Sequence, residues 1–251
     1  MYVTIKNKKI NYEISGKGTQ WIVFVHGWGG SIKSLKKLSL AASAGTKYKT
    51  LIFDLPGFGL SDNPEPGWGV EEYAEVVTGL IKELDIDHPI YFGHSFGGSL
   101  GIWIAAKKLI PLEKLVLCAT SFKRTGKVNK PAVLMNKTVS TYLPFFSDMT
   151  AKMKPFLYKI FFRNSDLAKF PHLEPNFRKI ITHDLAPLVN DIRIPTLLLW
   201  GERDTYTPVA LADELEEKIP NAKKIIFPFK SHNLPIKYSD DVWKEMKSWL
   251  K

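Results

Sequence analysis

The 251-residue sequence predicts an α/β fold, a doubly wound and mostly parallel sheet with helices on both faces. Two observations support this prediction. Strand-like runs and helix-like segments alternate along most of the chain, as they do in folds with parallel sheets. Several of the runs are also continuously apolar, which is typical of strands that helices cover on both faces. These runs are 21–25, 51–53, 115–117 and 197–199.

The individual elements follow from the local pattern. The N-terminal segment alternates apolar and polar residues as a strand does, and later strands are bounded by turn residues. The expected strands are 2–5, 10–14, 21–25, 50–54, 90–92, 114–118, 196–200 and 224–228. The intervening helices are expected to include 70–84, 99–109, 209–219 and 239–250.

A segment of different character separates the sixth expected strand from the seventh. From about 121 to about 188 the chain is rich in aromatic residues, its pattern is helical, and prolines punctuate it, among them Pro131, Pro144, Pro155, Pro171 and Pro175. Because proline ends or kinks a helix, we expect several short helices here, which together resemble a lid. The chain is therefore divided into a first core part (1–120), a helical lid or cap (121–188) and a second core part (189–251).

Composition limits the class of protein. Hydrophobic residues make up 45% of the chain and charged residues 24%, as in an ordinary globular protein. No apolar run approaches the roughly 18 to 20 residues that cross a bilayer, and the N-terminus has no apolar signal segment, so a cytoplasmic location is expected. The single cysteine, Cys118, lies in an expected buried strand and is interpreted as a core thiol.

The net charge of +10 is concentrated in the predicted lid, where residues 121–163 contain nine basic residues and one acid. No zinc-ligand cluster, phosphate-cradling motif or nucleic-acid motif accompanies it, so we expect no metal, no cofactor and no nucleic-acid partner. Lys152, Lys154, Lys159 and Arg163 interleave with aromatic residues. This surface suits an acidic carrier protein, an anionic membrane or an acyl chain; the alternative is a solvated lysine-rich surface.

The most informative motif is Gly-His-Ser-Phe-Gly at 93–97, directly after an expected strand and before an expected helix. It matches the G-x-S-x-G pattern, in which a sharp strand-to-helix turn exposes the serine hydroxyl. The flanking glycines are required because a side chain at Gly93 or Gly97 would collide with the backbone as the chain reverses. The motif predicts that Ser95 is a nucleophile.

A serine nucleophile needs a base, and the base needs an acid that holds its tautomer. Among six histidines, His232 follows the last expected strand and reaches the carboxyl edge of the sheet, where sites in such folds gather. Asp204 lies after the preceding strand and is favoured as the acid, with Glu202 and Asp184 as competitors. The resulting order along the chain, serine then aspartate then histidine, is the order expected for this arrangement.

Stabilising an oxyanion requires two N–H donors aimed at one point. The backbone N–H of Phe96, directly after the nucleophile, is expected to be one donor. The other is expected from the glycine-rich turn at 26–30, from the backbone N–H of Trp28.

Through these motifs the chain resembles the α/β-hydrolase superfamily over essentially its full length. The resemblance rests on 26–30, 54–62, 93–98, 201–204 and 231–232. Within the superfamily the chain is most similar to small lidded serine esterases and carbon–carbon bond hydrolases, including pimeloyl-carrier-protein methyl ester esterases and meta-cleavage product hydrolases. One departure is Ser231, because the family usually has glycine before its catalytic histidine.

We expect hydrolysis of carboxylic esters through an acyl-enzyme, in which Ser95 attacks, His232 acts as base and Asp204 orients the imidazole. Serine at the turn argues against the carboxylate-nucleophile chemistry that this fold also supports. Carbon–carbon bond or lactone hydrolysis on the same triad remains open, as does a ligand-binding signalling protein with slow turnover. The residues expected to line the substrate pocket are His26, Phe146, Phe161 and Phe162.

Overall fold

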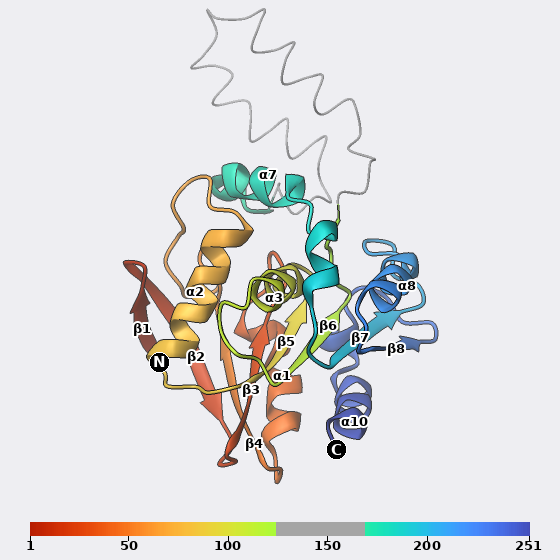
Figure 1. Cartoon of the computed structure of the whole chain (residues 1–251). Coiled ribbons are helices and arrows are strands. Elements are labelled where there is room, and N and C mark those ends of the chain that lie inside the picture. Colours follow the sequence, from red (N-terminus) through yellow and green to blue (C-terminus); the bar gives the residue numbers. More distant parts are fainter. Residues whose placement is uncertain (124–168) are drawn as a thin grey trace, which may run out of the picture.

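The centre of the computed structural model, which describes residues 1–123 and 169–251, is an eight-stranded sheet (Figure 1). Its spatial order is β1-β2-β4-β3-β5-β6-β7-β8. The strands are β1 (Tyr2–Ile5), β2 (Lys8–Ser15), β3 (Gln20–Val25), β4 (Tyr48–Phe53), β5 (Ile90–His94), β6 (Lys114–Cys118), β7 (Thr196–Gly201) and β8 (Ala222–Phe227). The two pairings made by β2 are antiparallel and all the others are parallel, so the predicted fold class is confirmed.

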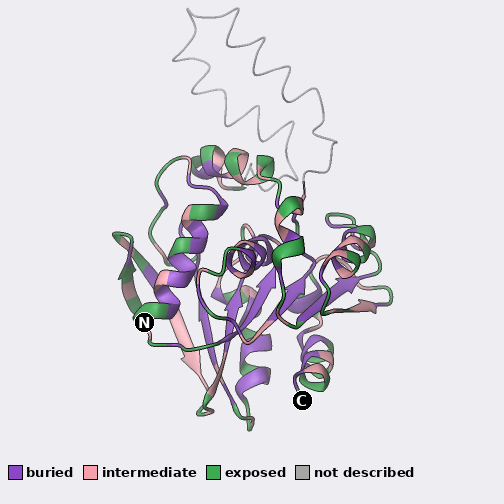
Figure 2. Ribbon diagram, in the orientation of Figure 1, coloured by how far each residue is buried: buried purple, intermediate pink, exposed green. Residues whose placement is uncertain are grey.

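Helices cover both faces of the sheet. One face packs on α2 (Val70–Glu83), α3 (Phe96–Ala106) and α8 (Val209–Lys218), and the other on α1 (Ile32–Ser43), α9 (Leu234–Lys237) and α10 (Ser239–Leu250). Neighbouring residues of β3 contribute to opposite cores: Val23 and Val25 face one, and Ile22 and Phe24 face the other. Figure 2 shows the resulting buried layer along the central strands. Both faces of these strands are covered, which explains their uninterrupted apolar sequence.

Helix α1 was not among the helices expected from sequence. Its buried positions, Ile32, Leu35, Leu38 and Ala42, recur every three or four residues, which is the spacing of one helical face. Three lysines lie between the first of these positions and Leu38, and they give the segment the polar character of a loop. The spacing of the apolar residues therefore indicated a helix, but the lysines between them made the segment look like a loop.

The connection from β6 to β7 contains the predicted lid, and part of it is described. It includes η2 (Pro171–Leu173), α7 (Glu174–Thr182) and η3 (Ala186–Asp191). Helix η3 contacts α3 and α8 of the core, and the N–H of Leu185 donates to the carbonyl of Phe122 at 2.7 Å. The domain boundaries at 120/121 and 188/189 stay predictions, and the lysine-rich stretch 152–163 lies outside the described residues.

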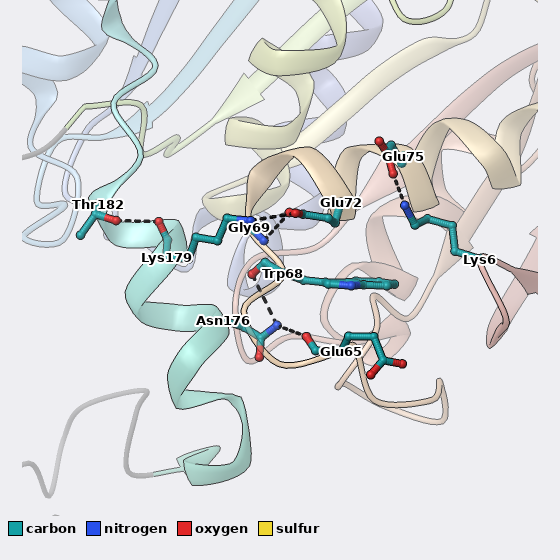
Figure 3. A network of polar contacts seen from close by, with 9 residues as sticks. All are labelled: Lys6, Glu65, Trp68, Gly69, Glu72, Glu75, Asn176, Lys179 and Thr182. Carbon is teal, nitrogen blue, oxygen red and sulfur yellow. Dashed lines mark hydrogen bonds and ion pairs between the residues drawn. The ribbon is translucent and has the colours of Figure 1, made fainter.

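Helix α7 is fastened to the loop before α2 and to the first turn of α2 (Figure 3). The Nδ2 of buried Asn176 donates to the carbonyls of Glu65 and Trp68 at 2.8 and 3.4 Å. The ammonium of Lys179 binds Glu72 at 2.7 Å, and Glu72 also accepts the N–H of Gly69. These contacts fix the position of α7 over the edge of the sheet. Within 1–123 and 169–251, no helix is long and apolar enough to span a membrane.

Candidate active site

Ser95 sits on the turn between β5 and α3 with φ 51° and ψ −112°, a conformation that few side chains adopt. Such strain costs about 1–3 kcal/mol and is found mostly at functional positions. The turn is held because the N–H of Ser95 donates to the carbonyl of Cys118 at 2.9 Å. A Cβ added at Gly93 would collide with the carbonyl of Gly97, and one added at Gly97 would collide with that of Val25. The two glycines therefore let α3 approach the sheet closely behind the serine.

Asp204 and His232 form a direct pair at the carboxyl edge of the sheet. Asp204 follows β7, His232 follows β8, and these strands are parallel neighbours. The Nδ1 of His232 lies 2.8 Å from Oδ2 of Asp204. Because the carboxylate can only accept, Nδ1 carries the proton and Nε2 is left as the proton acceptor.

Three further hydrogen bonds hold the Asp204 carboxylate, whose side chain is fully buried. Its Oδ1 accepts the N–H groups of Tyr206 and Thr207 at 2.9 and 2.8 Å, and its Oδ2 accepts the hydroxyl of Thr207 at 2.8 Å. Burial raises the pKa of this carboxyl, but the hydrogen bonds from His232 and Thr207 outweigh burial and leave the pKa below its usual value. Asp204 is therefore ionised at neutral pH and suited to orient an imidazole.

The two competing acids are engaged elsewhere. Glu202 accepts the N–H of Phe229 at 2.8 Å, and Asp184 accepts the N–H of Ala186 at 3.0 Å. Neither forms a hydrogen bond with His232 among the contacts of the described residues.

Ser95 and His232 line the same cavity of about 420 Å³, which we call the polar chamber. The buried ring of His94 lies beside the His232 ring, with centroids 5.1 Å apart. Its Nε2–H donates to the backbone carbonyl of His232 at 3.0 Å. This bond ties the residue before the nucleophile to the loop that carries His232.

The predicted oxyanion donors lie beside the serine. Trp28 and Phe96 both line a second cavity with Ser95, of about 160 Å³, which we call the apolar chamber. The bond from the N–H of Gly30 to the carbonyl of Gly27, at 2.9 Å, closes the turn around Trp28. Among the described residues, neither the backbone N–H of Trp28 nor that of Phe96 has a hydrogen-bond acceptor.

His26 does not line either chamber, in contrast to the expectation from sequence. Its side chain is fully buried; the N–H of Leu55 donates to Nε2 at 3.0 Å, and Nδ1 donates to the carbonyl of Gly27 at 2.8 Å. Both ring nitrogens thus brace the backbone behind the Trp28 turn. The other predicted pocket residues, Phe146, Phe161 and Phe162, lie outside the described residues.

Aromatic residues that were not assigned to the pocket from sequence do line the two chambers. Phe177 lies in the apolar chamber, and Phe170 and Tyr206 lie in the polar one. No local pattern singled them out, although Phe170 and Phe177 belong to the aromatic segment. In the described ranges, no cluster of three or more His, Cys, Asp or Glu side chains could hold a metal ion.

Burial of two histidines predicts sensitivity to acid. Burial lowers the pKa of His26 to about 4, and burial together with the nearby His232 lowers that of His94 to about 3. Unfolded histidines titrate near about 6.5, so between these values the unfolded chain binds more protons than the folded chain. We expect the free energy of unfolding to fall by about 4 kcal/mol from pH 7 to pH 5.

Urea denaturation at pH 7, 6 and 5 measures this loss. His26→Gln should remove about half of the dependence, because His94 remains, whereas the matched change His88→Gln, at a side chain that is 62% exposed, should leave it as in the parent. An unfolding free energy that is constant over this range would contradict the assignment of both buried rings as neutral.

Known proteins resemble this chain in sequence and structure. The 2-hydroxy-6-oxononadienedioate/2-hydroxy-6-oxononatrienedioate hydrolase of Cupriavidus pinatubonensis is 28% identical over 255 residues, covering 90% of this chain and 86% of the relative. The pimeloyl-[acyl-carrier protein] methyl ester esterase of Legionella pneumophila is 26% identical over 235 residues, covering 89% and 94%. The crystal structure of the enol-lactonase from Burkholderia xenovorans LB400 aligns with TM-score 0.78 and 25% identity over 100% of this chain and 99% of that one.

The resemblance inferred from the motifs is thereby confirmed, since both suspected types of hydrolase are among the relatives. Residues 20–158, more than half of the sequence, match the family model described as alpha/beta hydrolase fold. With this match, the sheet order and the strained serine turn, the chain belongs to the α/β-hydrolase fold family.

Proposed function

We propose that this hydrolase cleaves carboxylic esters through an acyl-enzyme formed on Ser95, as a serine carboxylesterase. One observation carries the proposal: His232, held by Asp204 at 2.8 Å through Nδ1, lines the same cavity as the strained serine. An imidazole whose Nδ1–H is held by a carboxylate presents Nε2 as the general base that a serine hydroxyl needs.

In the proposed reaction, Oγ of Ser95 bonds to the ester carbonyl carbon while its proton moves to Nε2 of His232. The carbonyl oxygen becomes an oxyanion on the N–H groups of Trp28 and Phe96, where the loss of one donor typically costs about 3 kcal/mol. The bond to the alcohol oxygen then breaks, and that oxygen takes the proton from His232. Water repeats the sequence on the acyl-enzyme, releasing the acid and restoring the serine.

The methyl ester esterase relative supports the ester bond as the target. A second candidate, carbon–carbon bond or lactone hydrolysis, is supported by the dienedioate hydrolase relative and by the structural likeness to an enol-lactonase. Both reactions use attack on a carbonyl, so the same residues would serve them. The localisation and partners expected from sequence remain proposals alongside this function.

A substrate panel separates the candidates. Turnover by the purified protein is measured separately with 4-nitrophenyl butyrate, an enol lactone and a vinylogous diketone of the ring-cleavage type. Samples quenched within milliseconds are analysed by mass spectrometry for a covalent adduct on the protein. We expect ester turnover and a butyryl adduct on the peptide that contains Ser95. Diketone cleavage at least 100-fold faster than ester cleavage would favour the second candidate, and turnover of none of the three would overturn hydrolysis in favour of a ligand-binding role.

A further inference from the structure

The two chambers meet at Ser95 but differ in their walls. Ser95 and Trp28 line both, whereas His232 lines only the polar chamber and Phe96 only the apolar chamber. Resting on the proposed function, we propose that the apolar chamber binds the acyl group of the ester and that it selects short, uncharged acyl groups of up to about six carbons.

The position of His232 indicates which part of the substrate each chamber binds. A general acid must reach the oxygen of the leaving alcohol, because it delivers the proton when the bond to the acyl carbon breaks. The alcohol part therefore lies in the polar chamber, with His232. The oxyanion points to the N–H groups of Trp28 and Phe96, so the remaining substituent of the tetrahedral carbon, the acyl chain, enters the apolar chamber.

The apolar chamber is open to solvent on one side, and its volume sets the length of acyl chain that it can bury. Its volume is about 160 Å³, against about 420 Å³ for the polar chamber. A dry protein cavity of about 150 Å³ lined by aliphatic and aromatic side chains accepts one benzene ring. A chain of four to six carbons, or one phenyl ring, occupies a comparable volume, as a rough guide from the same comparison.

The walls of this chamber are apolar and anchored. Phe177, Ile180 and Ile181 of α7 face Trp28 and Phe96, and the Phe177 and Trp28 ring centroids are 5.2 Å apart. Helix α7 is held on the α2 side by Asn176 and Lys179 (Figure 3). The wall is therefore a packed surface set by the fold, and its size can select among acyl groups.

Two polar side chains of the apolar chamber, Lys123 and Ser99, already have polar partners. The ammonium of Lys123 pairs with Glu214, the hydroxyl of Ser99 donates to the carbonyl of Ser121, and the ring of His183 packs edge-on against Trp103 with centroids 5.2 Å apart. A carboxylate at the far end of an acyl chain would lose its hydration in this chamber. The ammonium of Lys123 could not compensate for this loss, because it is already paired with Glu214. The chamber therefore disfavours acyl groups that end in a carboxylate.

A chain-length series tests this assignment. The specificity constant kcat/KM is measured for the 4-nitrophenyl esters of acetate, butyrate, hexanoate, octanoate and decanoate, and for the mono-ester of adipate. We expect a maximum at butyrate or hexanoate, at least a tenfold decrease at octanoate, and at least a tenfold decrease for the adipate mono-ester relative to hexanoate.

Substitutions in the chamber walls test whether the apolar chamber sets the preference for acyl-chain length. Phe177→Ala removes a wall and should move the maximum to octanoate or longer; Ile181→Ala, at a side chain that is 44% exposed, is a second enlargement with little risk to folding. Ile236→Ala enlarges only the polar chamber, so it should change the preference among alcohol parts while the acyl maximum stays in place.

Each outcome is decisive. A maximum at octanoate or beyond in the parent protein, a maximum that stays in place in both enlarged variants, or a maximum moved by Ile236→Ala would overturn the assignment while ester hydrolysis itself stands. Absence of an acyl adduct with every ester would instead overturn the proposed function.

Discussion

Replacing Ser95 by alanine should lower ester hydrolysis by at least about 10⁴-fold and abolish labelling by a fluorophosphonate. Serine and alanine share the same Cβ, so the variant keeps the backbone strain at φ 51° and loses only the hydroxyl that attacks the carbonyl. Hydrolysis is followed with 4-nitrophenyl butyrate, and labelling by the mass of the intact protein. The stability of the variant should match that of the parent in urea.

The matched control is Ser99→Ala, one helical turn later, where the hydroxyl donates to the carbonyl of Ser121. This variant should still take up one equivalent of the fluorophosphonate. If Ser95→Ala retained labelling or more than a tenth of the hydrolysis, Ser95 would not be the nucleophile and the proposed reaction would fail.

Asp204→Asn should reduce kcat by about 10³- to 10⁴-fold with little change in folding. The amide nitrogen would face Nδ1 of His232 and donate to it, which forces the ring proton onto Nε2 and removes the acceptor that Ser95 needs. The amide oxygen can still accept the N–H groups of Tyr206 and Thr207, so the loop keeps its shape. Steady-state kinetics on the same aryl ester measure the loss.

Glu202→Gln supplies the comparison, because this carboxylate lies two residues away and accepts the N–H of Phe229 instead of contacting His232. We expect it to reduce kcat by less than about threefold, as a surface polar substitution does. A large loss in Glu202→Gln combined with a nearly active Asp204→Asn would transfer the role of the acid to Glu202.

The positions of Ser95, Asp204 and His232 were easier to predict from this sequence than the shape of the pocket. The Ser95 turn, Asp204 and His232 each follow a strand within a few residues, so a local motif together with the parallel direction of the strands places them at one edge of the sheet. The structure brings Asp204 and His232 into contact at 2.8 Å. Local sequence was sufficient to place these residues because parallel strands end at the same edge of the sheet, however far apart they are along the chain.

The chamber walls could not be predicted in this way. Trp28 and Phe177 lie far apart in the sequence and line one cavity only because α7 folds back over the sheet. His26 is a further example: it was expected among the pocket residues, but its ring turns inward and hydrogen-bonds the backbone of Leu55 and Gly27. The direction of a side chain at a turn depends on tertiary contacts, and these leave no periodic pattern in the sequence.

The closely packed glycines behind Ser95 have a consequence for how this protein can change over evolution. Because Gly93, Gly97 and Gly98 leave no space for a methyl group, the position of the nucleophile is set by contacts that involve backbone or the Thr120 side chain. Substitutions in α7 do not touch those contacts. Substitutions in the chamber walls can therefore change which substrates are accepted while the reacting atoms keep their positions. Loss of any one of these glycines would instead displace the nucleophile and abolish activity on every substrate.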